Sequence, residues 1–166
     1  LSDWREGEVH ADSAWQSLYD PNYLIANIAG GEGFDWYYNG PEGEAAQRRL
    51  PIRDEALGED WIWRYKDIRS WWSLPHHPRI DGQRQTEPTA WVPMSKPIRF
   101  TEYGCPAVDR GTNQPNLFHD AASSEGALPR ASAGMRDDLI QMQYLRAMAE
   151  FASHLDLNRL EQPSQR

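Results

Sequence analysis

The run KPIRFTEYG at residues 96–104 most constrains the fold, because it predicts a buried β-strand that ends in a carboxylate. Ile98 and Phe100 are typical strand residues, and Pro97 lies at the start, where no backbone donor is needed. Glu102 then falls at the C-terminal end of the strand. In (β/α)8 barrels the functional side chains lie at that end. We therefore interpret Glu102 as a candidate catalytic group, against the alternative of a solvated or salt-bridged surface glutamate.

Four segments are predicted to be helices from the spacing of their apolar residues and from their capping. The helix over residues 12–19 would be capped by Asp12 or Ser13, both typical N-cap residues, and residues 22–29 and 61–72 carry apolar side chains at helical spacing. Residues 135–155 give the clearest pattern, since two aspartates in the first turn favour the helix dipole. We expect this last helix to pack on the outer wall of a barrel.

The segments between these helices are predicted to be turns and loops. Residues 34–39 gather aromatic side chains in a short helix or turn, and residues 40–59 form a polar, exposed loop. Residues 74–93 contain four prolines, which favour an irregular segment. A second long loop, residues 105–133, follows the Glu102 strand. Loops of this length are commonly functional, and in a barrel the second would lie over the active face.

Length and composition limit both the fold and the partners. A (β/α)8 barrel typically needs about 250 residues, whereas this chain has 166, so we expect only part of a barrel. With 25 Asp and Glu against 17 Lys and Arg, a nucleic acid partner is not expected, because phosphates require a basic surface. No apolar run reaches the roughly 18 residues that indicate a membrane span.

The chain offers few residues that would bind a metal or form a redox site. Its single cysteine, Cys105, excludes an internal disulfide and a zinc site built on cysteines. His76 and His77 are adjacent, so in an extended segment their side chains point to opposite sides and make a poor chelating pair. The other histidines show no metal-binding spacing. We therefore expect no metal and no cofactor.

Several stretches of the sequence together resemble one family. They are LSDWR (1–5), NIAGGEG (27–33), WRYKD (63–67), FTEYGCPAVDRGTNQPN (100–116), SSE (123–125), ALP (127–129) and RDDLIQ (136–141). They resemble the TIM-barrel-like domain of the hub, or host-specificity, protein of gene transfer agents, which are phage-like particles of alphaproteobacteria. By this resemblance, residues 1–155 are the C-terminal portion of a (β/α)8 domain, helix-rich with few strands. They would lack the first half and the closing strand. Residues 156–166 do not match, and we expect an atypical or disordered tail.

The resemblance implies a role at the cell envelope, since the family is described as glycoside-hydrolase-like and lies in the particle's tail tip. The expected partners are a cell-surface or peptidoglycan-type glycan and other tail or baseplate proteins. The expected location is the particle tail, assembled in the cytoplasm and released. Two hypotheses follow: a glycoside hydrolase that cleaves envelope glycan, or a non-catalytic structural, receptor-binding or carbohydrate-binding module of the tail tip.

Glycoside hydrolysis requires two carboxyl groups, and Glu102 supplies only one of them. By resemblance to retaining glycosidases of barrel fold, Glu102 would be the nucleophile, and its acid/base partner would lie upstream of Leu1. We therefore expect this chain alone to be inactive. Asp3 and Asp35 are the nearest substitutes within the chain, although each is better interpreted as a helix cap or a loop carboxylate.

Aromatic side chains stack on the apolar faces of sugar rings, and the chain has eight tryptophans. We interpret five aromatic residues near expected loop or strand ends as substrate-binding candidates, with core packing as the alternative: Trp4, Trp36, Tyr37, Trp91 and Tyr103. Trp15, Trp61 and Trp72 are expected in the core. Arg64, Arg69 and Arg79 either bind acidic sugar substituents or form salt bridges with the surplus carboxylates.

Overall fold

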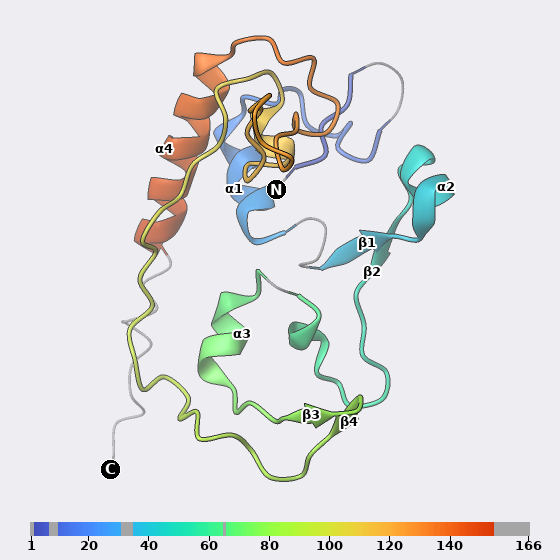
Figure 1. Cartoon of the computed structure of the whole chain (residues 1–166), viewed down its shortest axis with the longest axis vertical. Coiled ribbons are helices and arrows are strands. Elements are labelled where there is room, and N and C mark those ends of the chain that lie inside the picture. The colour runs from blue at the N-terminus through green and yellow to red at the C-terminus, as the bar shows by residue number, and fades with distance from the viewer. Residues whose placement is uncertain (1, 7–9, 31–34, 65, 155–166) are drawn as a thin grey trace.

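The computed structural model describes residues 2–6, 10–30, 35–64 and 66–154. These ranges contain short helices and strands joined by long irregular segments (Figure 1). In chain order the elements are α1 (Pro21–Ala29), β1 (Trp36–Tyr38), α2 (Gly40–Ala45), β2 (Arg49–Pro51), the 3₁₀ turn η1 (Asp60–Ile62), α3 (Ile68–Ser73), β3 (Arg79–Ile80), β4 (Gln83–Arg84), the 3₁₀ turn η2 (Gly111–Asn113) and α4 (Asp138–His154).

The predicted helices over residues 22–29 and 135–155 are confirmed as α1 and α4. Helix α1 begins after Asp20, whose carboxylate accepts a hydrogen bond from the Asn22 amide at 2.9 Å, and a proline occupies its first position. Helix α4 begins three residues later than predicted. Its start is stabilised by the Asp137 carboxylate, which accepts from the Ile140 amide at 3.0 Å.

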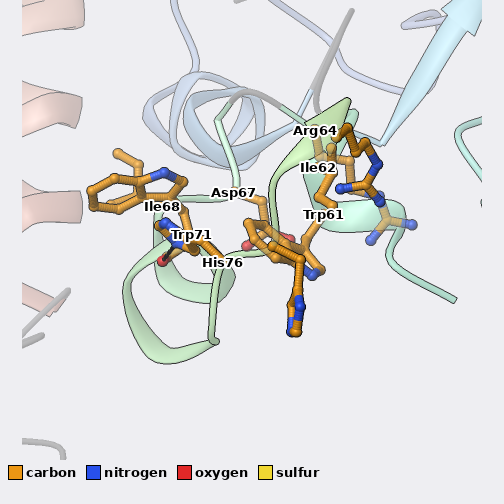
Figure 2. Close-up of a pocket in the computed structure, with 9 residues that line it drawn as sticks. Trp61, Ile62, Arg64, Asp67, Ile68, Trp71 and His76 are labelled. Carbon is orange, nitrogen blue, oxygen red and sulfur yellow. Dashed lines mark hydrogen bonds between the residues drawn. The ribbon is translucent and has the colours of Figure 1, made fainter. Parts of the chain in front are cut away.

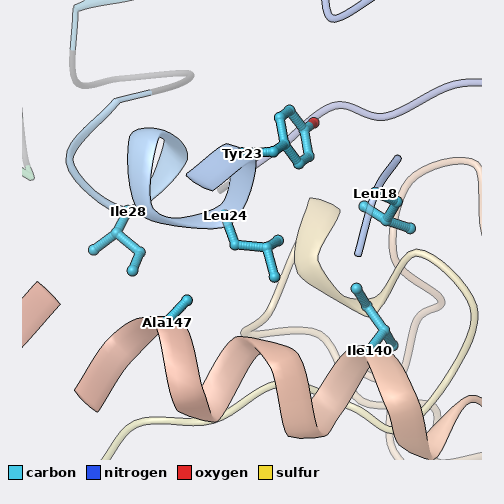
Figure 3. Close-up of a cluster of buried hydrophobic side chains, with 6 residues drawn as sticks. All are labelled: Leu18, Tyr23, Leu24, Ile28, Ile140 and Ala147. Atoms are coloured by element: carbon cyan, nitrogen blue, oxygen red, sulfur yellow. The ribbon is translucent and has the colours of Figure 1, made fainter. Parts of the chain in front are cut away.

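The core lies where α1 packs against α4, as Figure 3 shows. Tyr23 and Ile140 are fully buried there. Aromatic rings surround this contact, and Trp4 meets the Tyr23 ring edge-on with centroids 5.3 Å apart. The apolar side of α4 that we predicted would face a barrel wall faces α1 in the described residues. The buried members of the core are Leu18, Tyr23, Leu24, Ile28, Ile140 and Ala147.

Residues 34–39 were predicted to form a short helix or turn, but residues 36–38 form a strand. Residues 40–59 were predicted to form an exposed loop, but they contain a helix and a strand. In the structure β1 pairs antiparallel with β2, with Tyr37 opposite Leu50, and α2 lies between the two strands. The alternation explains the strand, because Trp36 and Tyr38 are half-buried and Tyr37 between them is exposed. Aromatic residues also have high strand propensity.

Two other predicted helices are interrupted or absent. Among the described residues of 61–72, the helical parts are η1 and α3, because the Asp67 carboxylate accepts from the Ser70 amide at 3.1 Å and begins a new helix there. Residues 12–19 form turns instead of a helix. Asp12 does not cap a helix, since its carboxylate accepts from Arg49 at 2.7 Å and 3.0 Å and from the Tyr23 hydroxyl at 2.9 Å.

The predicted strand over residues 96–104 is absent from the described structure, which contains two separate two-stranded antiparallel sheets, β1–β2 and β3–β4. The segment runs as irregular chain from the α3 region toward the start of α4 (Figure 1). Phe100, Glu102 and Tyr103 are exposed on it. A strand needs a neighbour with which to exchange hydrogen bonds, and no described strand lies beside this segment to supply them.

The long loops predicted over residues 74–93 and 105–133 are largely confirmed, apart from the β3–β4 hairpin and η2. Cys105 is buried at the start of the second loop, and burial raises the pKa of its thiol to about 12. The Gln141 side chain donates to the Cys105 carbonyl at 2.8 Å and so connects this loop to α4. No helix in the described ranges has the length and apolarity needed to cross a membrane.

Candidate functional site

A pocket of about 430 Å³ lies beside α3, between η1 and the segment that leads into β3 (Figure 2). Two interactions hold α3 in place. Asp67 caps its start, and Trp72 is buried with its indole N–H donating to the Lys96 carbonyl at 2.6 Å. The pocket therefore has a defined framework. Its lining residues are Trp61, Ile62, Arg64, Asp67, Ile68, Trp71, His76, His77 and Arg79.

Aromatic rings form one wall of this pocket. The His76 ring lies 4.9 Å from the Trp71 ring, 5.5 Å from Trp61 and 5.4 Å from Trp91, on which it stacks at 17°. Backbone carbonyls fix two of the rings: His76 Nε2 donates to the Trp71 carbonyl at 2.7 Å, and the Trp91 indole donates to Leu74 at 3.1 Å. Trp71 nevertheless remains 49% exposed. The Trp71 ring is thus the accessible aromatic surface of the cluster.

Charged side chains lie around the aromatic wall. Glu59 accepts from Arg79 at 2.6 Å and from Arg84 at 2.9 Å. Burial alone would raise the pKa of the Glu59 carboxyl, but the hydrogen bonds from these two arginines outweigh it and lower that pKa below its usual value. Glu59 is therefore ionised at neutral pH. Arg79 lines the pocket, and Arg84 does not.

Two further polar groups complete the lining. Arg64 donates to the Ile52 carbonyl at 3.1 Å and to Asp60 at 3.2 Å, while its Nε has no hydrogen-bond partner among the described residues. His77 Nδ1 donates to the Gln85 carbonyl at 3.1 Å, because a carbonyl can only accept. In the neutral ring this leaves His77 Nε2 as an acceptor. The pocket therefore offers both donors and acceptors beside a stacking surface.

This combination of groups is suited to a sugar ring. The apolar face of a pyranose stacks on an aromatic plane, and nearby donors and acceptors bind the hydroxyls. Metal chemistry has no comparable support, because the residues the structure describes include no group of three or more histidine, cysteine, aspartate or glutamate side chains that could hold a metal ion.

A second polar cluster surrounds Asp3, which we considered as a substitute carboxylate. Its side chain is 1% exposed and accepts from Tyr38 at 2.7 Å, Gln47 at 3.2 Å and Arg5 at 3.3 Å, with Arg130 at 3.5 Å. Burial alone would raise the pKa of Asp3, but these hydrogen bonds and charges outweigh it and lower that pKa. Both carboxylate oxygens are engaged with protein groups, so Asp3 stabilises the fold rather than contacting a ligand.

The structure places the predicted aromatic candidates in separate groups instead of on one platform. Trp4 packs on the core beside Tyr23. Trp36 contacts Tyr38 and lies under the Arg49 guanidinium, 4.0 Å away, with Tyr37 exposed beside it on β1. Of the five candidates, Trp91 joins the aromatic cluster beside the pocket through its ring contacts with Trp71 and His76, although it does not itself line the pocket.

The predicted catalytic residue lies on a different segment from the pocket. Glu102 and its neighbour Tyr103 are exposed on the irregular segment 96–104, and neither lines the pocket. The other substitute carboxylate, Asp35, is exposed next to β1. The catalytic role of Glu102 and the substrate-binding roles of the aromatic residues stay predictions.

Sequence reasoning missed the importance of Trp71 and His76, and it assigned Trp61 to the core. Trp61 is half-buried and lines the pocket, whereas Trp72 is buried as expected. One signal was available, because five of the eight tryptophans fall within residues 61–91. Such a concentration in a proline-rich, sparsely aliphatic segment indicates aromatic surface more than core.

Comparison with known proteins agrees with the resemblance noted in the sequence. The model of one family, described as the GTA TIM-barrel-like domain, matches residues 1–164. No curated protein matches the chain significantly. Because the match spans nearly all of the 166 residues, the chain belongs to the GTA TIM-barrel-like domain family.

Proposed function

We propose that this gene transfer agent domain binds cell-envelope glycan through the pocket beside α3. The observation that carries the proposal is the aromatic cluster of Trp71, His76 and Trp91, which leaves Trp71 half-exposed next to charged and hydrogen-bonding side chains. An exposed ring that belongs to a contiguous aromatic cluster with a polar rim is typical of an interaction site, whereas a single exposed ring is not. A sugar ring is a fitting cover, because it has an apolar face and a polar rim.

The wider role we propose is contact with the recipient cell by the tail tip of a phage-like particle. In this setting the domain works beside other tail or baseplate proteins and corresponds to the C-terminal portion of a (β/α)8 barrel. The family match supports the gene transfer agent origin of the domain. The glycan, the tail location and the protein partners are proposals that rest on the pocket and on the resemblance.

Hydrolysis is the second candidate function, and Glu102 is the residue on which it depends. A glycosidase needs two carboxyl groups about 5 Å apart for retention, or about 6.5 to 9.5 Å apart for inversion. Among the residues described, Glu102 is exposed and takes part in no hydrogen bond or ion pair. Binding is therefore the function we favour for this chain, with catalysis by Glu102 as the alternative hypothesis.

The test is a binding titration with matched tryptophan variants. Tryptophan fluorescence and calorimetry would follow the addition of peptidoglycan fragments and a panel of neutral and acidic oligosaccharides. Trp71→Ala removes the most exposed ring of the cluster and is expected to weaken binding about fivefold, since one stacking contact contributes about 1 kcal/mol. Trp63→Ala is the matched control, because Trp63 is 56% exposed and does not line the pocket.

Saturable binding that Trp71→Ala weakens and Trp63→Ala preserves would support the proposal. Absence of binding to every saccharide, or equal losses in both variants, would overturn it. A folded-state check by circular dichroism is simple here, because both side chains are exposed and neither substitution should unfold the protein.

A further inference from the structure

We propose that the pocket beside α3 selects glycans that carry a negatively charged substituent, a carboxylate or a phosphate on the sugar ring. This inference rests on the proposed glycan binding and specifies its substrate class. It starts from the charges around the pocket, which differ from those of the rest of the chain.

The first observation is the ion-pair arrangement at the pocket edge. Arg79 and Arg84 both bind the same carboxylate, that of Glu59, at 2.6 Å and 2.9 Å. Two guanidinium groups thus share one negative charge, which leaves one positive charge in excess. Arg79 is the member of this triad that lines the pocket. A guanidinium binds carboxylate and phosphate groups through paired N–H donors.

The second observation concerns the acidic groups near the pocket, which are already engaged. Asp60 pairs with Arg64 at 3.2 Å, and the Asp67 carboxylate accepts from the Ser70 amide at the start of α3. Arg64 still has one donor, Nε, with no hydrogen-bond partner among the described residues. The lining itself therefore carries two guanidinium groups, Arg64 and Arg79, and one carboxylate, Asp67, which is a positive balance within the pocket.

The third observation is the distribution of charge along the chain. Residues 59–84 hold five Lys and Arg against four Asp and Glu, whereas the other residues hold twelve against 21. The pocket therefore lies in a stretch with a slight positive balance within an acidic chain. An acidic ligand is repelled by most of the surface and attracted here, so charge directs it to the aromatic wall.

The experiment compares sugars that differ only in charge. The probes are trigalacturonate and its neutral methyl ester, and the N-acetylglucosamine–N-acetylmuramic acid disaccharide and its neutral carboxamide. N-acetylglucosamine 6-phosphate and N-acetylglucosamine distinguish phosphate from carboxylate recognition. For wild-type protein we expect each anionic probe that binds to bind about tenfold more tightly than its neutral form. This preference should shrink as salt rises from 0.02 to 0.5 M.

Two arginine variants locate the preference in the pocket. Arg79→Gln is expected to remove most of the anionic preference, so that the affinity for each anionic probe falls much more than the affinity for its neutral form. Arg84→Gln is the matched control: it breaks the other half of the same Glu59 pair, but Arg84 lies outside the pocket lining. A smaller loss is expected there, through the charge alone.

The outcomes separate this inference from the function on which it rests. Equal affinity for charged and neutral forms, with the loss in Trp71→Ala intact, would overturn the anionic selectivity and keep the glycan site. An anionic preference that Arg79→Gln and Arg84→Gln reduce equally would also overturn it, since the charge would then act from outside the pocket. Absence of binding to all probes would defeat the proposed function itself.

Discussion

The region around α1 and α4 and the region of residues 59–94 use aromatic side chains in opposite ways. Around α1 and α4, rings and aliphatic groups are buried together, and Tyr23 is fully enclosed while its hydroxyl donates to Asp12. In residues 59–94, Trp72 is the large apolar side chain that is buried, whereas Trp63, Trp71 and Leu74 are exposed. The first region obtains its stability from burial, and the second exposes its rings around a pocket.

The difference also appears in the ion pairs. Each region has a carboxylate that binds two arginines: Asp3 with Arg5 and Arg130, and Glu59 with Arg79 and Arg84. The Asp3 side chain is 1% exposed and that of Glu59 is 16% exposed. The same chemistry therefore serves the fold in one region and lies beside a candidate ligand site in the other.

The largest effect is expected from Ile140→Ala, which removes a fully buried side chain from the contact between α1 and α4. Truncation of such a residue costs about 2 to 5 kcal/mol, because apolar contacts are lost and a cavity remains. Urea unfolding at neutral pH measures the free energy of unfolding. The control is Leu139→Ala on the exposed side of α4, with an expected loss of about 0.5 kcal/mol. Equal losses at the two sites would contradict the core assigned here.

A second prediction compares the two shared carboxylates. Asp3→Asn is expected to lower the free energy of unfolding at pH 7 by about 2 kcal/mol, because it removes the buried carboxylate and leaves Arg5 and Arg130 paired with the more exposed Glu44. Glu59→Gln is expected to cost about 1 kcal/mol, since its carboxylate and both arginines are closer to solvent.

The pKa values of Asp3 and Glu59 determine how their contribution to the free energy of unfolding changes with pH. The pKa of each carboxyl is lower in the folded protein than its ordinary value of 3.8 or 4.5. The stabilisation is therefore fully present above about pH 5 and is lost as the pH falls through the folded pKa. The gap between wild type and Asp3→Asn should narrow on acidification below about pH 4, measured by urea unfolding across pH. A gap that widens there would mean that Asp3 is not held ionised by its partners.

The sequence predicted best the elements that depend on local signals. Helices α1 and α4 were found because apolar spacing and capping residues act within one or two turns. The strand over residues 96–104 failed for the opposite reason, since a strand forms only where a partner strand lies beside it. Trp36 to Tyr38 was misassigned likewise, because its pairing with residues 49–51 across α2 is not visible in the local pattern.

The candidate site was predicted only in part. Trp91 was proposed as a binding residue, and it joins the aromatic cluster beside the pocket. Trp71 was missed because its exposure depends on the break between η1 and α3, which divides the helix predicted over residues 61–72. That break follows from Asp67 acting as an N-cap, a competition between side chain and helix that apolar spacing does not reveal.

The smallest effect is expected from Glu102→Gln. Glu102 is exposed, so the substitution should change the free energy of unfolding by less than about 0.5 kcal/mol. Glycan affinity should also be unchanged, because Glu102 lies outside the pocket lining. Aryl β-glycosides and peptidoglycan fragments, incubated with this chain, should remain intact with wild type and variant alike.

A single contrary result would change the comparison between the two regions. If wild-type protein released the aryl group and Glu102→Gln did not, the functional centre would be the exposed segment 96–104, with the pocket as an accessory binding site. The same assay on a longer protein separates two explanations of inactivity. Turnover that appears only there, and disappears with Glu102→Gln, would mean that the second carboxyl group comes from outside these 166 residues, as the two-carboxyl requirement of glycoside hydrolysis demands.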